Sequence, residues 1–237
     1  MRSLICRGLA DYGLEARVPA GAARTLELYA QLLLEKNKVM NLTAITEPDQ
    51  VAYLHMLDCA ALLKYLDLAD KRLLDVGTGA GFPGMVLKIL VPSLDVTLLD
   101  SLNKRLDWLA ETCRTLELEN IRTVHTRAEE KSHDPSFREQ FDFAASRAVA
   151  ELRTLCELCL PYVKVGGTFL AMKAVDSDPE LTAATPAVKA LGGAVETVAD
   201  YQIPGTDVHH RLILIKKISE CPKKYPRSFA KIKKNPL

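Results

Sequence analysis

Glycines recur at every second position in one segment of the 237-residue chain, L-D-V-G-T-G-A-G-F-P-G over residues 74–84. Alternate glycines let a backbone turn sharply and approach a bound molecule where a Cβ atom would collide. A strand is predicted before this loop and a helix after it, and open parallel sheets bind ligands outside the carboxyl ends of their strands. The segment therefore predicts a ligand-binding loop rather than a plain turn.

Two classes of ligand fit this glycine loop. Gly79, Gly81 and Gly84 satisfy the G-x-G-x-x-G pattern of dinucleotide-binding proteins, and Asp100 follows about 20 residues later, where an acid binds a ribose. The ribose of S-adenosylmethionine would use the same acid. Asp100 therefore does not discriminate between the two cofactors.

Pro83 and Asp75 favour S-adenosylmethionine. Pro83 removes one of the backbone N–H groups that a pyrophosphate needs at the start of a helix. Asp75 would add negative charge beside an anionic dinucleotide, whereas S-adenosylmethionine has no phosphate and carries sulfonium and ammonium charges. An NAD(P)-dependent oxidoreductase is the alternative, and it would also need a substrate domain for which few residues remain.

Short apolar runs alternate with amphipathic helices after residue 70, which is typical of βαβ units and a mostly parallel sheet. We expect five parallel strands and then an antiparallel pair, at residues 72–76, 95–99, 121–125, 141–146, 168–173, 194–203 and 209–216. Leu102, Leu106, Leu109, Cys113 and Leu116 predict the helix after the second strand. The fold class is α/β, and the order resembles the seven-stranded sheet of class I methyltransferases.

Three domains are expected along the chain. Residues 1–67 keep helical spacing and form an N-terminal helical extension, residues 68–217 form a Rossmann-like domain that binds S-adenosylmethionine, and residues 218–237 form a basic tail. His55 and Asp58 lie three apart on one helix of the extension. That spacing also fits a metal or catalytic pair, but we interpret it as a structural hydrogen bond.

Positive charge is concentrated at the C-terminus. The chain has a net charge of +1, yet residues 216–237 hold eight basic residues and one acidic residue, which leaves a net charge of −6 for the rest. Tyr225 and Phe229 lie among these basic residues, so the tail is suited to binding a phosphate backbone. The alternative is a solvated, poorly ordered terminus.

The sequence predicts a cytoplasmic protein with reduced thiols and no metal. The longest stretch without a charged residue is the 12 residues 76–87, whereas a membrane-spanning helix needs about 20 apolar residues. Arg2, Arg7 and Asp11 leave no room for the apolar part of a secretory signal. The six cysteines lack the spacing of a disulfide scaffold, and the C-x-x-C at residues 156–159 has no second pair to complete a zinc site.

Several ordered segments resemble the RsmG family of ribosomal RNA small subunit methyltransferases, also called glucose-inhibited division protein B. Besides the glycine loop they are N-K-V-M-N-L-T-A-I-T (37–46), H-M-L-D (55–58), L-L-D-S-L-N-K-R (98–105) and S-R-A-V-A (146–150). The resemblance implies methyl transfer from S-adenosylmethionine to N7 of a guanine in 16S ribosomal RNA. It also implies that the partner is this RNA or the small ribosomal subunit, and we expect a monomer.

The resemblance places the cofactor contacts in loops at the carboxyl ends of four strands. They are Gly77, Gly79, Phe82, Asp100, Ser101, Leu102, Ala128, Glu129 and Arg147. We expect Asp100 to bind the ribose and Ala128 with Glu129 to border the adenine. Arg147 would hold the methionine carboxylate with its planar guanidinium, and the alternative for Arg147 is a salt bridge at a strand end.

The implied reaction needs no catalytic general base, because guanine N7 already carries an in-plane lone pair. The enzyme's task is then in-line positioning of the reactants. N7 faces the deep, narrow major groove of an RNA duplex, so the target guanine must lie in a loop or be splayed out. The residues expected to meet phosphates are Lys104, Arg105, Lys173, Lys223, Lys224 and Arg227. A solvated helix face is the alternative for Lys104, and a non-enzymatic ribosome-assembly factor is an alternative for the chain.

Overall fold

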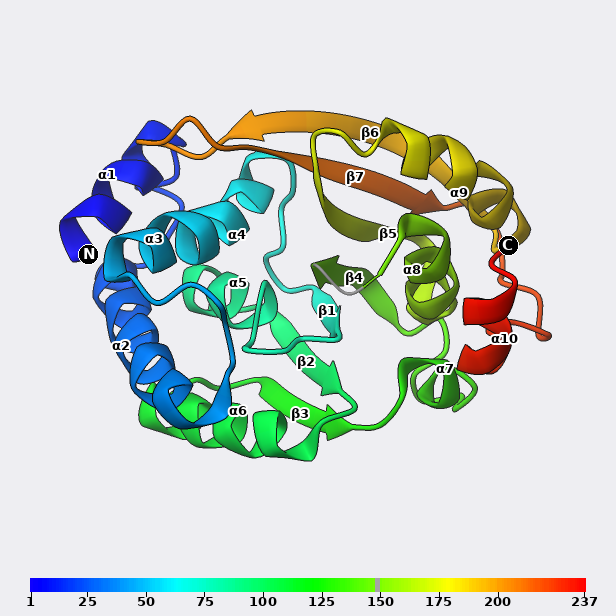
Figure 1. Cartoon of the computed structure of the whole chain (residues 1–237), viewed down its shortest axis with the longest axis horizontal. Coiled ribbons are helices and arrows are strands. Elements are labelled where there is room, and N and C mark those ends of the chain that lie inside the picture. The colour runs from blue at the N-terminus through cyan, green and yellow to red at the C-terminus, as the bar shows by residue number, and fades with distance from the viewer. Residues whose placement is uncertain (148–149) are drawn as a thin grey trace.

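The computed structural model describes residues 1–147 and 150–237, and the strands of this part form one seven-stranded sheet (Figure 1). The strand order is β3-β2-β1-β4-β5-β7-β6. The strands are β1 (Arg72–Val76), β2 (Asp95–Asp100), β3 (Ile121–His125), β4 (Phe141–Arg147), β5 (Val163–Ala174), β6 (Gly193–Gln202) and β7 (His209–Lys217). β1 to β5 pair in parallel, and β7 is antiparallel to both of its neighbours, β5 and β6. The expected methyltransferase-like sheet is therefore confirmed. Residues 148 and 149 of the S-R-A-V-A segment lie outside the described residues.

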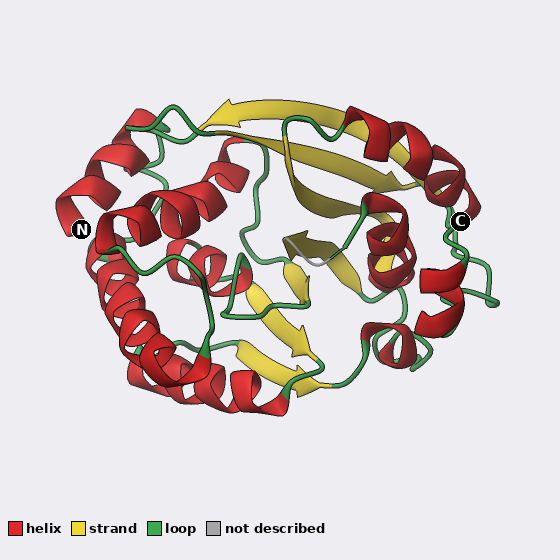
Figure 2. Cartoon of the chain, viewed as in Figure 1, coloured by secondary structure: helices red, strands yellow, loops and turns green. Residues whose placement is uncertain are grey.

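Helices pack on both faces of the sheet (Figure 2). They are α1 (Arg2–Asp11), α2 (Ala22–Met40), α5 (Gly84–Leu90), α6 (Asn103–Thr115), α7 (Ala128–Lys131), α8 (Leu152–Cys159), α9 (Asp178–Ala190) and α10 (Phe229–Lys234). Successive residues of a strand point to opposite faces. Leu73 of β1 therefore joins a core with Met85 of α5, whereas Leu74 joins a second core with Leu155 of α8. Burial on both faces explains the continuous apolar runs of these strands.

β5 begins at Val163 rather than at the predicted residue 168. Gly166 has a φ of 86°, and the pairing of β5 with β4 shifts register between Phe141 and Phe143. The first residues of β5 are therefore separated from the regular part of the strand by an irregularity that an apolar run does not reveal.

Residues 1–67, all of which are described, contain helices and no strand, as their spacing predicts. A non-helical connection at residues 41–47 follows α2, and residues 48–64 are then continuously helical, as α3 (Pro48–Val51), a π-helical turn (Ala52–Leu57), α4 (Asp58–Ala60) and a 3-10 turn (Ala61–Lys64). Leu26 and Met56 of this extension share one buried core with Val86 and Leu98 of the sheet domain. No helix in the described ranges is long and apolar enough to cross a membrane. The boundaries of the three domains stay a prediction.

The C-terminal tail packs against the sheet domain instead of extending into solvent. Tyr225 and Ile232 are buried in the core on the α8 face, and α10 contacts α8 (Figure 1). The alternative of a poorly ordered terminus is therefore wrong. The basic tail nevertheless keeps Lys223, Lys224 and Lys233 exposed.

Candidate functional site

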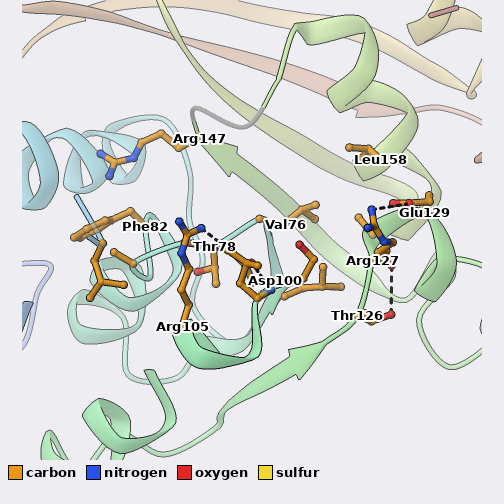
Figure 3. Close-up of a pocket in the computed structure, with 18 of the residues that line it drawn as sticks. Val76, Thr78, Phe82, Asp100, Arg105, Thr126, Arg127, Glu129, Arg147 and Leu158 are labelled. Atoms are coloured by element: carbon orange, nitrogen blue, oxygen red, sulfur yellow. Dashed lines mark hydrogen bonds and ion pairs between the residues drawn. The ribbon is translucent and has the colours of Figure 1, made fainter. Parts of the chain in front are cut away.

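A cavity of about 550 Å³ opens where β1, β2, β3 and β4 end (Figure 3). The nine residues expected to hold the cofactor all line it, namely Gly77, Gly79, Phe82, Asp100, Ser101, Leu102, Ala128, Glu129 and Arg147. Parallel strands bring their carboxyl ends to one edge of a sheet, so residues up to 70 positions apart in the chain meet there. Contact between these residues and a cofactor stays a prediction, but their convergence on one cavity is a property of the fold.

The glycine loop is held from behind by Asp75. Its Oδ2 accepts hydrogen bonds from the Thr78 hydroxyl (2.7 Å) and the Gly84 amide (2.8 Å). Asp75, whose charge was expected beside the ligand, is fully buried behind the loop and is not among the cavity-lining residues. Burial raises the pKa of this carboxyl to about 6. Asp75 is thus a buried support that fixes both ends of the loop.

The glycines of the loop serve two different purposes. Gly77 and Gly79 have φ angles of 69° and 57°, which side chains disfavour, and both line the cavity. A Cβ atom on Gly81 would lie 2.6 Å from the Tyr29 hydroxyl, and one on Gly84 would lie 2.8 Å from Asp75 Oδ2. The last two glycines of the G-x-G-x-x-G pattern therefore allow close packing of the protein itself.

The start of α5 has its first amides already engaged. Pro83 has no N–H, the Gly84 amide donates to Asp75, and the Met85 amide donates to the carbonyl of Gly81. A pyrophosphate is bound by free N–H groups at a helix start. This geometry does not offer the donors that a dinucleotide needs, and it supports the inference from Pro83.

Asp100 lies at the end of β2 with its carboxylate at the cavity (Figure 3). Its Oδ2 accepts a hydrogen bond from the Gly79 amide and its Oδ1 accepts one from the Leu102 amide, each at 2.9 Å. A carboxylate oxygen can accept more than one hydrogen bond, so both oxygens keep acceptor capacity for ribose hydroxyls. The two amides fix the direction of the carboxylate.

Leu102 does not belong to the buried stripe of α6 that its spacing predicts. The helix begins at Asn103, and Leu102 precedes it in an extended conformation with a φ of −109° and a ψ of 99°. Its side chain is 51% exposed and lines the cavity instead of the core. The spacing alone could not locate this helix boundary.

Arg147, at the end of β4, is held by the N-terminal extension. Its guanidinium donates to the carbonyl of Leu54 (3.0 Å), to Asp58 Oδ2 (3.1 Å) and to His55 Nδ1 (3.0 Å). It also lies over the Phe82 ring, 4.7 Å from the ring centre. The salt bridge considered for Arg147 is therefore present, and the same side chain lines the cavity.

The π-helical turn explains why the carbonyl of Leu54 is available to Arg147. The amide of Asp58 bonds to the carbonyls of His55 and Tyr53, bypassing that of Leu54. The Leu54 carbonyl accepts the Arg147 guanidinium. Such turns occur frequently at functional sites.

His55 is neutral, and contacts at both of its ring nitrogens fix the orientation of the ring. Burial, followed by the nearby Arg147 charge, lowers the pKa of His55 to about 4. Nδ1 lies 3.0 Å from both the Arg147 guanidinium and the carbonyl of Leu54, and Nε2 lies 2.8 Å from the Thr43 hydroxyl. His55 and Asp58 do not bond to one another as their spacing suggested, and each contacts the Arg147 guanidinium instead. Within the described ranges, no group of three or more metal-ligating side chains occurs.

Asp58 joins three parts of the fold. Besides Arg147, its carboxylate accepts hydrogen bonds from the Tyr201 hydroxyl (2.8 Å) in β6 and from His210 Nδ1 (2.7 Å) in β7. Burial by itself raises the pKa of Asp58, but the hydrogen bond from His210 and the Arg147 charge outweigh it and lower this pKa. The hydrogen bond to Asp58 in turn raises the pKa of His210.

A second cavity of about 530 Å³ lies beside the first and shares His55 and Arg147 with it. Most of its wall is apolar, and its other lining residues are Ile45, Leu54, Asp58, Met172, Lys173, Ala174, Glu180, Val208 and His210. The two cavities therefore meet at one shared pair of side chains. The sequence offered no pattern that predicts this second cavity.

The residues expected to meet RNA phosphates fall into two groups. Lys104, Lys223 and Lys224 are exposed. Three others have protein partners: Arg105 lies 3.9 Å from Asp100, Lys173 forms a 2.6 Å ion pair with Glu180, and Arg227 forms one with Glu157. The side chains of Lys173 and Arg227 are 13% and 21% exposed. Contact with RNA stays a prediction for all six.

Further residues line the first cavity without having been predicted as cofactor or RNA contacts, and four of them lie beyond the glycine loop, β2 and the N-terminal extension. Thr126 and Arg127 directly follow β3, so their place at a strand end was a usable signal. Leu158 lies in α8, and Phe229 lies in the tail helix α10. No local pattern marks the last two, because their approach to the cavity depends on packing between distant elements.

The strand order, the antiparallel β7 and the glycine-loop cavity at the strand ends define a Rossmann-like methyltransferase fold. Precorrin-6y C5,15-methyltransferase from Geobacter metallireducens GS-15 shares it, with a TM-score of 0.52 and 18% identity over 73% of this chain and 90% of that chain. The TYW2 protein of M. jannaschii, solved in complex with AdoMet, has a TM-score of 0.52 and 12% identity over 65% of this chain and 72% of that chain.

A family model and two relatives with similar sequences identify the family of the chain. The model of GidB, rRNA small subunit methyltransferase G, matches residues 22–209. Ribosomal RNA small subunit methyltransferase G of Lachnoclostridium phytofermentans is 50% identical over 212 residues, which cover 89% of this chain and 88% of the relative. The protein of the same name from Clostridium botulinum (strain ATCC 19397 / Type A) is 45% identical over 210 residues, 88% of each chain. The chain belongs to the rRNA small subunit methyltransferase G family, as its motifs predict.

Proposed function

We propose that this chain transfers a methyl group from S-adenosylmethionine to N7 of a guanine in 16S ribosomal RNA. One observation carries the proposal: in a chain of the rRNA small subunit methyltransferase G family, the nine expected cofactor residues line one cavity at the strand ends. The engaged amides at the start of α5 argue against a dinucleotide there. Neither the oxidoreductase nor the non-enzymatic alternative has comparable support.

The cavity residues fit the three parts of S-adenosylmethionine. Ala128 and Glu129 would border the adenine, Asp100 would accept from the ribose hydroxyls, and Arg147 would hold the methionine carboxylate. When bound, this cofactor supplies an electrophilic methyl group on a sulfonium. Arg147 and His55, which the second cavity shares, would hold its amino-acid end.

We place the target guanine in the second cavity. Its apolar wall, which includes Ile45, Leu54 and Met172, suits the faces of a base taken out of its stack. Positive charge passes to the guanine ring during the reaction; at the junction His55 is neutral, and the charge of Arg147 is paired with Asp58. N7 needs no proton removed, so these residues orient and exclude water rather than act as a base.

The cofactor site is tested with Asp100→Ala and its matched control Asp107→Ala, which removes an exposed acid from α6. A hydrogen bond to a charged group contributes about 1.5 to 3 kcal/mol. We therefore expect calorimetry to show S-adenosylmethionine affinity about 10- to 100-fold weaker in the first variant and unchanged in the control. Thermal unfolding of both variants checks that the fold is kept.

The reaction is tested by mapping N7-methylguanine in 16S ribosomal RNA incubated with wild type and with Asp100→Ala. We expect one modified guanine with wild type and a loss of modification with the variant. Wild-type protein that binds NAD(P) and not S-adenosylmethionine would favour the oxidoreductase. RNA binding without any methyl transfer would favour the assembly factor.

The proposed partner is the 16S ribosomal RNA of the small subunit, and the proposed place of action is the cytoplasm, where bacterial ribosomes assemble. We also propose that the chain acts as a monomer. Sedimentation of the purified protein with and without RNA measures this directly. A dimer in the absence of RNA would contradict the last proposal.

A further inference from the structure

Phe229 brings the C-terminal tail to the cofactor cavity. It is the first residue of α10, it lines the cavity together with Leu158 of α8, and 38% of its surface is exposed. Of the other residues of α10, Ile232 is buried in the core, and Ala230 and the three lysines are exposed. A large aromatic ring left partly exposed at a cavity wall is available to a bound molecule.

An ion pair between Arg227 and Glu157 fixes the tail in this place, two residues before Phe229. Glu157 of α8 is fully buried, and its carboxylate accepts three hydrogen bonds from Arg227: the backbone amide (2.8 Å), Nε (2.9 Å) and Nη2 (2.6 Å). The residue after Glu157 is Leu158, which lines the cavity beside Phe229. Two neighbouring residues of α8 thus have different roles. Glu157 holds the tail, and Leu158 forms the cavity wall next to Phe229.

Contacts earlier in the tail, at residues 221–226, hold it against the segment that follows α7. His133 Nε2 lies 3.0 Å from the carbonyl of Pro226, and Arg138 donates to the carbonyls of Tyr225 (2.9 Å) and Cys221 (2.8 Å). α7 carries Ala128 and Glu129, the residues placed beside the adenine. Figure 1 shows α7, α8 and α10 grouped at this side of the molecule.

We propose that the tail supplies one wall of the adenine subsite, with the Phe229 ring packing against the adenine of S-adenosylmethionine. This inference rests on the proposed function and adds a ligand contact from outside residues 22–209, the part that the family model matches. Adenine offers a flat aromatic face, and a partly exposed phenyl ring gains stacking and burial from it. The methionine end of the cofactor lies away from Phe229, at Arg147.

The test measures binding of two probes, S-adenosylmethionine and 5′-methylthioadenosine, to wild type and to Phe229→Ala. Methylthioadenosine keeps the adenine and ribose but lacks the amino-acid end. Base–aromatic stacking typically contributes a 5- to 150-fold effect on affinity, and for this half-exposed ring we expect about tenfold weaker binding of both probes alike. Phe229→Leu, which keeps an apolar side chain, should lose less. Val198→Ala, which truncates another exposed apolar residue far from the cavity in β6, should bind both probes as wild type does.

Three outcomes separate this inference from the proposed function. Unchanged probe affinity in Phe229→Ala, together with lost affinity in Asp100→Ala, overturns the role of Phe229 and leaves the proposed function standing. If Phe229→Ala keeps its affinity for both probes but has a raised KM for RNA, the ring contacts RNA instead of adenine. This outcome also overturns the adenine contact. Wild-type protein that binds neither probe removes the proposed function itself. Equal unfolding temperatures of the Phe229 variants and wild type show that the effect is not a loss of fold.

Discussion

Asp58 is a buried carboxylate whose hydrogen bonds come from Arg147, Tyr201 and His210, each on a different strand. A buried carboxylate is stable only with such partners, because burial without them costs several kcal/mol. The Tyr201 and His210 bonds fix the Asp58 carboxylate, and the bond from Arg147 to it helps to hold that guanidinium beside both cavities. A residue of the helical extension thus determines the orientation of a side chain in the sheet domain.

The His210–Asp58 pair makes stability depend on pH. The raised pKa of His210 lies above its unfolded value of about 6.5. The protonated pair therefore stabilises the fold fully below about pH 6.5, and this contribution is lost as the pH rises through the folded pKa. We expect the difference in free energy of unfolding between wild type and His210→Gln to be largest below pH 6.5 and to shrink at higher pH.

Urea unfolding at a series of pH values from 5 to 9 measures this difference. His209→Gln is the matched control, because His209 is its exposed neighbour on β7 and lacks the Asp58 contact. A difference between wild type and His210→Gln that stays constant across this series would show that the charge of His210 does not contribute.

At the scale of elements, an ion pair between Arg227 and the buried Glu157 anchors the tail just before α10. The carboxylate of Glu157 is fully buried, and Arg227 satisfies both of its oxygens. The apolar contacts of Tyr225 and Ile232 add burial on the same face. The position of the tail therefore depends on a pairing between residues 70 positions apart.

Arg227→Ala is expected to lower the free energy of unfolding by about 3 kcal/mol, because it leaves the Glu157 carboxylate buried and unpaired. Chemical denaturation measures this change. Lys223→Ala, an exposed change in the same tail, should leave stability within about 0.5 kcal/mol of wild type. The double variant Glu157→Met with Arg227→Met should recover much of the loss, because no buried charge remains. If Arg227→Ala were as stable as Lys223→Ala, this account would be contradicted.

Elements with a strong hydrophobic period were predictable from the sequence, and residues fixed by long-range contacts were not. The central strands and α6 follow from apolar runs and helical spacing, and the cavity follows from where those strands end. The buried position of Asp75, the exposed Leu102 and the approach of Phe229 depend on three-dimensional packing. A local sequence pattern carries no information on which distant element will cover a residue.

At the scale of the whole molecule, the helical extension and the sheet domain share a core. Leu26 and Met56 of the extension are buried with Val86 and Leu98 of the sheet domain. Tyr29 lies 6.5 Å from Trp108 of α6, ring centre to ring centre. Neither part can be removed without exposing apolar surface of the other.

We therefore expect one cooperative unfolding transition. The fluorescence of Trp108, the single tryptophan of the chain, reports on the contact between α2 and α6, and far-ultraviolet circular dichroism reports on all helices. The two transitions should have the same midpoint in urea. Loss of circular dichroism at a lower urea concentration than loss of fluorescence would show that part of the helical structure unfolds independently.

The buried Asp75 behind the glycine loop has a consequence for the affinity of the site. The hydrogen bonds of Asp75 to Thr78 and Gly84 join protein groups only, so they fix the backbone around Gly77 and Gly79 without a contribution from the ligand. A molecule that enters then loses little affinity to ordering of the chain, and more of its contact energy appears as tight association. The conformational entropy of the glycine loop is lost once, when the chain folds, and not at every catalytic cycle.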